Sequence, residues 1–525
     1  MSRPPVTRGP GLLRSGAVFS AMTLLSRLAG FARDMLQARL FGVSAAMDAF
    51  VVAYRIPNYL RRIFAEGSMQ MAFVPVFNEL RQRGDKAALR DFLDHMAGAL
   101  CAVVLVVVAV GMLAAPLVAG LFAPGSLDEP FKIGLITQML RITFPYLFFI
   151  SLMALVASVL NSFGRFALPA VTPVLHNLTV IAAMFWLAPF MAVPPVALAW
   201  GVLAAGVIQL ALLWPALGRL GLRPRFKAGF KHPDVRRVAK LMGPTLVSSS
   251  VAQLNLLVGT VFASLLVTGS QTWLYLSDRL VEFPLGLFGV AIGTVILPHL
   301  SRRHADSDAE SYSHALDWAM RMALLLGVPA GLGLILLAGP LTATIYQYGE
   351  FTAFDTRMAA ISLSAMAVGV PAFMLSKVLM PAFYARQDTK TPMRAALWTI
   401  AANVLLTIAI TTPLWLLGIE GAHGGIALAT GLAGIFNAWL LWRYVRRAGL
   451  HRPLPGWGLL AVRLGVACIA LAVAVLAMRG WVGDFRALPT WWRVFWLLAT
   501  VGAGMVAYVV ALGVAGMRPS DLREH

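Results

Sequence analysis

The stretch from Ser26 to Ser68 reads SRLAGFARDMLQARLFGVSAAMDAFVVAYRIPNYLRRIFAEGS. Its apolar residues have the length and character of two membrane-spanning helices. Within that apolar frame lie the charged residues Arg27, Arg33, Asp34, Asp48, Arg55, Arg61, Arg62 and Glu66. An ionisable group is costly to place in hydrocarbon, so it normally faces a bundle interior or a water-filled cavity. The stretch therefore predicts a charged, water-filled pocket that receives an anionic substrate.

The composition is that of a polytopic membrane protein. Of 525 residues, 59% are hydrophobic and 13% are charged, whereas soluble domains carry about 25% charged residues. The formal net charge is +20, an excess that can indicate nucleic-acid binding. In a membrane protein it indicates cytoplasmic loops that obey the positive-inside rule, so we expect no nucleic-acid partner. Cys101 and Cys468 lie in separate apolar runs, and neither a disulfide framework nor a thiol metal site is expected.

Apolar runs long enough to cross a bilayer recur along the whole chain. About 20 apolar residues span the hydrocarbon, and this criterion predicts an all-α integral membrane protein with about fourteen transmembrane helices. Lys and Arg gather in alternate loops, most densely in residues 219–240, where eight occur. The basic side is expected to be cytoplasmic, and an even number of helices then places both termini on that side.

The basic segment 219–240 is the expected cytoplasmic linker between two lobes. This division assigns six helices to an N-terminal lobe (1–218), six to a C-terminal lobe (241–447) and a further pair to residues 448–525. A weak internal repeat supports it, because a short outer turn leads in each half into a helix with charges and prolines. The matching positions are Gly42, Asp48, Arg55 and Pro57 in the first half and Gly269, Asp278, Arg279 and Pro284 in the second. With six helices per repeat, the repeat axis would follow the membrane normal.

Helical spacing groups the charges of the opening stretch by face and depth. Arg27 and Asp34 are seven residues apart and share a face, while Arg61 lies roughly 20 Å from the outer end of its helix. Structural ion pairing, Arg27 with Asp34 and Arg62 with Glu66, is an alternative interpretation. It leaves the excess of arginine over acid unexplained. Arginine suits phosphate, because its planar fork makes bidentate contacts and stays charged when partly desolvated.

The second half contributes a further arginine within an apolar run. Arg279 is flanked by Asp278 and Glu282 in the segment LYLSDRLVEFPLG. These acids could neutralise it, but an arginine opposite the first cluster would complete a cationic pocket between two lobes. The residues thus favour a two-lobed transporter with a cavity for a large anionic amphiphile.

Other function classes find little support in the residues. No GxxxxGK[ST] loop and no HExxH motif occurs, so no catalytic residue, metal site or cofactor is predicted. A multidrug exporter would need an aromatic, acid-containing pocket for organic cations, and an arginine-rich pocket argues against that class. An enzyme acting on polyprenyl phosphates would need its charged residues clustered at one interface, whereas these lie at different depths.

The longest motifs closely resemble one family. They are SRLAGFARD (26–34), DAFVVAYRIPNYLRRIFAEGSMQMAFVPVF (48–77), SDRLVEFPLGLFGVAIGTVILP (277–298), GEFTAFD (349–355) and YARQDTKTP (384–392). The chain resembles MurJ (MviN)-type lipid II flippases of the multidrug/oligosaccharidyl-lipid/polysaccharide exporter superfamily over essentially its whole length. The resemblance implies two six-helix lobes arranged as a V, plus two extra C-terminal helices, in the bacterial cytoplasmic (inner) membrane.

The resemblance also implies a transport function in peptidoglycan biosynthesis. Such flippases carry lipid II, an undecaprenyl-pyrophosphate disaccharide-pentapeptide, from the inner to the outer leaflet by alternating access. This transport supports cell-wall synthesis and cell shape. Lipid II and membrane lipids are therefore the expected partners, and proteins of cell-wall synthesis or division are candidate ones. The family is not one of enzymes.

Individual positions match the family's substrate cavity. Its arginines correspond to Arg27, Arg33, Arg61 and Arg279, and acidic positions important in the family correspond to Asp34, Asp48 and Glu66. Some relatives are thought to bind sodium through carboxylate and amide groups of the seventh, eleventh and twelfth helices. This chain keeps Asn255 and Asn403 there but has no Asp or Glu in those helices. A hard cation prefers charged oxygen ligands, so a proton gradient or membrane potential is at least as well indicated.

Overall fold

The computed structural model describes residues 11–62, 69–289, 296, 300–302 and 308–518, and within these residues every regular element is a helix. The prediction of an all-α protein is thus confirmed. The chain divides into two compact units, Met1–Leu265 and Leu266–His525. Each unit has its own helices and its own apolar core, and each is described by itself below.

The described helices include many that could cross a membrane. Nine of those in the described residues are long and apolar enough. A tenth span is formed if α15 (Ala353–Ala367) and α16 (Val370–Tyr384), which meet at 44°, are taken together. Other expected spans correspond to shorter pieces, such as α2 (Ala45–Arg61) and α3 (Met69–Gln82). The total of about fourteen spans stays a prediction.

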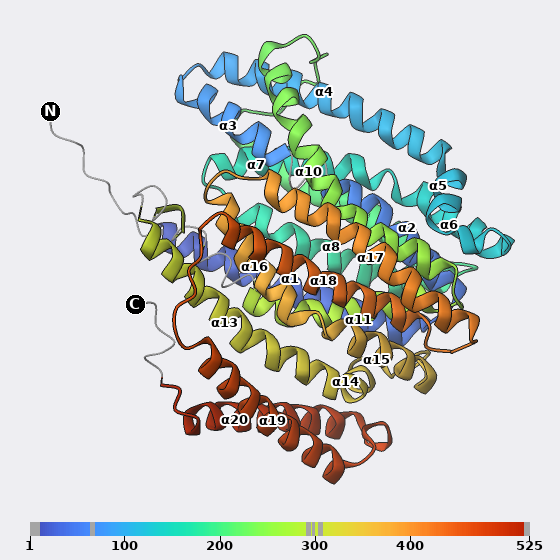
Figure 1. Cartoon of the computed structure of the whole chain (residues 1–525). Helices are drawn as coiled ribbons and strands as arrows, with labels where there is room; N and C mark the ends of the chain where they lie inside the picture. The colour runs from blue at the N-terminus through green and yellow to red at the C-terminus, as the bar shows by residue number, and fades with distance from the viewer. Residues whose placement is uncertain (1–10, 63–68, 290–295, 297–299, 303–307, 519–525) are drawn as a thin grey trace. The chain divides into compact units, whose positions relative to one another are not determined.

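The described residues of the first unit form ten α-helices, most of which are labelled in Figure 1. They are α1 (Gly11–Phe41), α2, α3, α4 (Lys86–Leu113), α5 (Ala115–Phe122), α6 (Pro130–Thr143), α7 (Tyr146–Ser162), α8 (Ala167–Trp186), α9 (Val196–Arg219) and α10 (Pro233–Ser264). Within it α1 packs along α8, α2 along α6, and both α7 and α8 along α9. The rings of Phe73 and Phe92 stack at 5.8 Å and join α3 to α4.

The helix that follows the basic linker packs within the first unit. α10 lies against α3, α4 and α5, and the division into compact units falls after it, at Leu265. The sequence predicts instead that this seventh span belongs to the second lobe. The expected lobe limits remain a prediction, whereas the contacts of α10 with the first unit are a feature of the structure.

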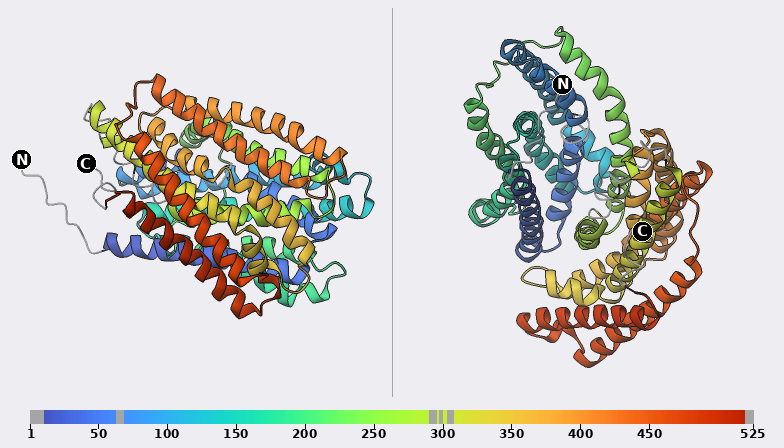
Figure 2. Two further views of the ribbon diagram at one scale, coloured as in Figure 1. Left: turned by 60° about the horizontal axis from the view of Figure 1, so that its bottom comes forward. Right: turned by 90° about the vertical axis from the view of Figure 1, so that its left-hand side faces the viewer.

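The described residues of the second unit form nine α-helices. They are α11 (Ser270–Pro284), α13 (Ala309–Leu336), α14 (Ala338–Tyr346), α15, α16, α17 (Lys390–Leu416), α18 (His423–Arg447), α19 (Trp457–Val482) and α20 (Thr490–Val514). α19 and α20 form a hairpin that lies along α13 and α14 (Figure 2). The Arg479 guanidinium donates to the Leu336 carbonyl at 2.6 Å, and the Tyr508 hydroxyl donates to the Leu325 carbonyl at 2.7 Å.

Local side chains explain where several helices begin. Ser44 accepts a hydrogen bond from the Met47 N–H at the start of α2, and Asp85 accepts from two backbone N–H groups in the first turn of α4. Thr352 and Asp355 form a reciprocal capping box at the start of α15. Each contact satisfies backbone donors that the helix itself leaves unpaired.

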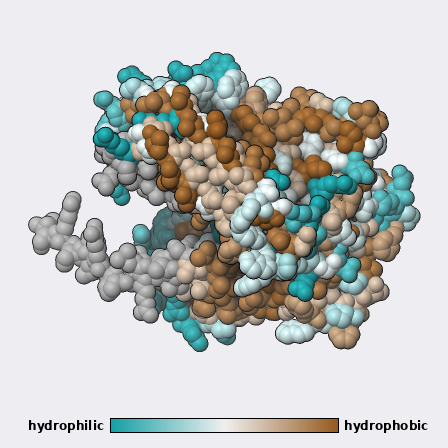
Figure 3. Space-filling model, turned by 90° about the horizontal axis from the view of Figure 1, so that it is seen from below, coloured by the Kyte–Doolittle hydropathy of each residue, from teal (hydrophilic) through white to brown (hydrophobic). Residues whose placement is uncertain are grey.

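Much of the molecular surface is apolar, as expected for a protein surrounded by lipid. Large hydrophobic side chains of α19 and α20, such as Val462, Ile469 and Val509, are exposed. Wide apolar areas, coloured brown, are visible on the face drawn in Figure 3. Soluble monomeric proteins rarely expose apolar patches of this extent. They support the assignment of the chain as a multi-pass membrane protein.

Candidate functional site

A buried ion pair lies where α1 crosses α8. The Arg33 guanidinium donates twice to Asp34 Oδ1, at 2.7 and 3.1 Å, and donates with Nη1 to Asn177 Oδ1 at 3.1 Å. The side chains of Arg33 and Asp34 are only 8% and 3% exposed. The Asn177 amide in turn donates to the Ser26 carbonyl at 3.1 Å. The two predicted site residues, which are neighbours in the sequence, are thus connected to a helix far along the chain.

Aromatic rings and an imidazole extend this cluster, and no sequence motif predicts their place in it. The Arg33 guanidinium lies 6.0 Å from the centre of the Tyr54 ring. The His176 ring lies 6.5 Å from that of Tyr54 and 5.7 Å from that of Tyr146. Both ring nitrogens of His176 are buried without a hydrogen-bond partner among the described residues. A single histidine in an apolar helix carries no motif, so only the fold reveals its neighbours.

Two arginines at successive depths of α2 bind neutral groups. Arg61 donates to Asn58 Oδ1 through Nε (3.1 Å) and Nη2 (2.9 Å). Arg55 donates to the hydroxyl of Thr260 on α10 at 3.0 Å. The Asn58 amide and the Thr260 hydroxyl thus help to orient these two guanidinium groups. Both arginines are half-buried.

The predicted residue Asp48 lies at the other end of α2 and faces a different partner. Its carboxylate is 1% exposed and lies 3.7 Å from Nζ of Lys132 on α6, which is 4% exposed. Asp48 and Arg61 are thirteen residues apart, or about 20 Å of helix. Asp48 therefore takes part in a buried ion pair near the start of α2, far from Arg61 along the same helix. Lys132 carries no sequence motif that predicts this pairing.

The remaining predicted residues have varied surroundings. Arg27 is exposed on α1. In the second unit, Arg279 donates to Glu282 Oε2 at 2.7 Å and lies 4.9 Å from the centre of the Tyr275 ring. Glu66 lies outside the described residues, as does the side chain of Asn255. The pairing of Arg62 with Glu66 therefore stays an open alternative.

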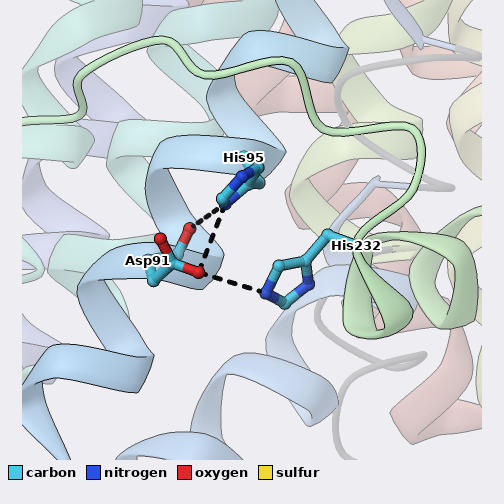
Figure 4. Close-up of side chains that lie close together, drawn as sticks. All are labelled: Asp91, His95 and His232. Atoms are coloured by element: carbon cyan, nitrogen blue, oxygen red, sulfur yellow. Dashed lines mark hydrogen bonds and ion pairs between the residues drawn. The ribbon is translucent and has the colours of Figure 1, made fainter.

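A second group of titratable side chains anchors the basic linker to α4 (Figure 4). Asp91 Oδ2 lies 3.4 Å from His95 Nδ1 and 3.6 Å from His232 Nε2, and its Oδ1 accepts from Lys227 Nζ at 2.7 Å. That hydrogen bond holds the pKa of Lys227 above its usual range. Asp91, His95 and His232 each offer one ligand atom, and these atoms are close enough to one another to hold a metal ion. Two of these groups already have other partners. His95 Nδ1 donates to the Asp91 carbonyl at 2.8 Å, and Lys227 neutralises the Asp91 carboxylate.

Backbone contacts reinforce this anchor. Buried Asp94 accepts the Arg225 N–H at 2.8 Å, and its carbonyl accepts the Lys227 N–H at 3.1 Å. A Cβ atom at Gly98 would overlap the Lys227 carbonyl, and one at Gly229 would overlap the His95 carbonyl. The linker therefore lies directly on α4, at positions where only glycine leaves enough room.

We expect Asp94→Ala to release the linker from α4. The substitution removes the hydrogen bond from the Arg225 N–H to a charged carboxylate, a kind of bond that contributes about 1.5–3 kcal/mol. Trypsin cleaves after the exposed basic residues of the linker, so cleavage between α9 and α10 should become faster in the purified variant. Asp128→Ala, at an exposed acid elsewhere in the same unit, is the matched control. Equal cleavage rates in the two variants would show that Asp94 does not hold the linker.

Comparisons with known proteins identify the family. The family model described as "Lipid II flippase MurJ" matches residues 37–499. The chain is 40% identical to the "Probable lipid II flippase MurJ" of Vibrio cholerae, over 99% of each chain. It is 40% identical to the "Lipid II flippase MurJ" of Burkholderia cenocepacia, over 88% of this chain and 89% of that protein.

Solved structures agree with this assignment. The fold matches a structure described as "Lipid II flippase MurJ, inward closed conformation" with a TM-score of 0.80 and 27% identity, over 95% of this chain and 98% of that one. An inward-facing multidrug transporter of the MATE family shares the fold at a TM-score of 0.65 and 13% identity, over 83% and 98%. The resemblance inferred from the motifs is thus confirmed, and the chain belongs to the MurJ family of lipid II flippases.

Proposed function

We propose that this protein transports lipid II, the undecaprenyl-pyrophosphate-linked peptidoglycan precursor, from the inner to the outer leaflet of the bacterial cytoplasmic membrane by alternating access. The observation that carries the proposal is membership of the lipid II flippase family across residues 37–499. Identity of 40% to flippases from two bacteria over most of the chain supports it. The multidrug transporters share only the fold, at 13% identity.

The chemistry of the first unit suits a pyrophosphate. Arg33 is desolvated yet held by Asp34 and Asn177, and Arg61 is held by a neutral amide. We assign Arg27, Arg33, Arg61 and Arg279 to binding of the pyrophosphate. Each charge-assisted contact to phosphate contributes roughly 1.5–3 kcal/mol. Asp34, Asp48 and Glu66 are assigned to the same substrate-binding set, where they hold cations in place and limit the net charge.

The protein is proposed to act as a transporter without catalytic residues, cofactor or metal ion. Its basic linker and both termini are assigned to the cytoplasmic side by the positive-inside rule. Proteins of cell-wall synthesis or division are proposed as partners, because they produce and consume lipid II. The absence of acids from the seventh, eleventh and twelfth predicted spans favours a proton gradient or membrane potential over sodium as the driving force.

Two measurements test this function. In sealed vesicles that contain the purified protein and fluorescent lipid II, transfer between leaflets should exceed that in protein-free vesicles, and imposing sodium, proton and voltage gradients in turn identifies the driving force. In cells, depletion should accumulate intact lipid II on the cytoplasmic face. Accumulation of the immediate precursor of lipid II instead would indicate an enzyme. A cavity that is open to both faces of the membrane at the same time would indicate a channel.

A further inference from the structure

The second unit contains an apolar groove of about 870 Å³ that the transport function does not explain. Its walls come from α13, α16, α18 and the segment 451–457 that leads into α19. Three tryptophans line it, Trp439, Trp442 and Trp457, together with aliphatic residues such as Leu375 and Ile435. Trp439 and Ile435 are exposed, so the groove opens to the surroundings of the protein.

One wall of the groove is rigidly built. Asp317 on α13 is fully buried and accepts hydrogen bonds from His451 Nε2 (2.8 Å), Trp457 Nε1 (2.8 Å) and Arg321 Nε (2.7 Å). Arg321 also donates to two carbonyls of the segment, those of Leu454 and Pro455. These bonds fix the segment 451–457 against α13, so the groove is preformed.

The end of the groove nearest the helix terminus carries positive charge. The guanidinium of Arg443 lies 5.3 Å from the centre of the Trp439 ring, and that of Arg446 lies 5.1 Å from the centre of the Trp442 ring. Both arginines are exposed. Two guanidinium groups therefore lie near the rings of the same tryptophans that line the apolar wall. An apolar groove beside two cations suits an amphiphile with an anionic head.

The length of the groove indicates what fills it. The lining residues Ile435 and Trp442 are seven residues apart on α18, which corresponds to about 10 Å of helix, and Arg446 lies one turn beyond Trp442. Half of a bilayer's hydrocarbon core is about 15 Å thick. The groove and the two arginines beyond it together extend over about 16 Å of α18, which matches the length of one acyl chain within a single leaflet. An undecaprenyl tail is far longer than this groove.

We propose that the groove binds an anionic diacyl phospholipid of the cytoplasmic leaflet. One acyl chain lies along Ile435, Trp439 and Trp442, and the phosphate lies between Arg443 and Arg446. Burial of each CH₂ group in the groove favours the bound lipid in detergent, where competing lipid is scarce. The two arginines provide the preference for an anionic head over a zwitterionic one. The leaflet follows from the cytoplasmic side proposed for the basic loops.

The test uses the purified full chain in detergent. Its thermal unfolding is followed during titration with phosphatidylglycerol or with phosphatidylcholine of the same acyl chains. We expect phosphatidylglycerol to stabilise the protein at a concentration several-fold lower than phosphatidylcholine. Arg443→Gln combined with Arg446→Gln should remove this preference. Arg447→Gln, at an exposed arginine next in sequence, is the matched control and should keep it.

A second variant tests the apolar part of the site. Ile435→Trp places a larger side chain in the groove at an exposed position and should weaken stabilisation by both lipids. Equal stabilisation by the two lipids in the unmodified protein, or an equal loss of preference in Arg447→Gln, would overturn the proposal. So would displacement of bound phosphatidylglycerol by an equimolar amount of lipid II, because the groove would then be a substrate site.

Discussion

Alanine at Arg27, Arg61 or Arg279 is expected to abolish the ability of this protein to sustain growth of a strain depleted of its own flippase. Each arginine is proposed to counter the pyrophosphate while it is away from water. Loss of one charge-assisted contact of roughly 1.5–3 kcal/mol weakens binding about tenfold to 150-fold. Growth after depletion, with membrane insertion checked by immunoblot, measures the effect.

Two further variants sharpen this test. Lysine at the same positions should restore growth only in part, because it keeps the charge but loses the planar fork. Arg141→Ala is the matched control, since Arg141 is an exposed arginine of a membrane helix outside the predicted site. Normal growth with all three alanine variants at native expression would contradict the assignment of these arginines to substrate binding.

Asp317→Ala is expected to cause the largest loss of stability. The carboxylate is fully buried, joins α13 to His451 and Trp457, and also accepts a hydrogen bond from Arg321 of the same helix. Removing one member of a buried charged network costs about 3–5 kcal/mol, because the partners keep their desolvation cost and lose their acceptor. The temperature of half-unfolding in detergent should fall well below that of the unmodified protein. Asp317→Asn keeps an acceptor oxygen and should lie in between.

Glu310→Ala is the matched control for this prediction. Glu310 is an exposed acid in the first turn of the same helix, so its removal should change stability by no more than about 0.5 kcal/mol. If Asp317→Ala and Glu310→Ala unfold at the same temperature, the network does not hold the segment 451–457 in place. The lipid groove would then lose its preformed wall as well.

The amino-acid sequence by itself determined the fold class and the family. An all-helical membrane protein follows from composition, because a chain with 59% hydrophobic residues can satisfy its backbone within lipid only as helices or a closed barrel. Long runs without alternation favour helices. The clustered arginines are also visible in the sequence, because a charge inside an apolar run is costly and therefore conspicuous.

Only the tertiary structure decided which group each charge meets. Helical periodicity relates residues on one helix, so it suggested Arg27 as the partner of Asp34; the contact seen is with Arg33, which Asn177 of α8 also holds. Asp48 pairs with Lys132 of α6, and His176 lies between two tyrosines. These contacts depend on where helices distant in sequence cross, and crossing points are set by packing of whole helix surfaces, which no local pattern encodes.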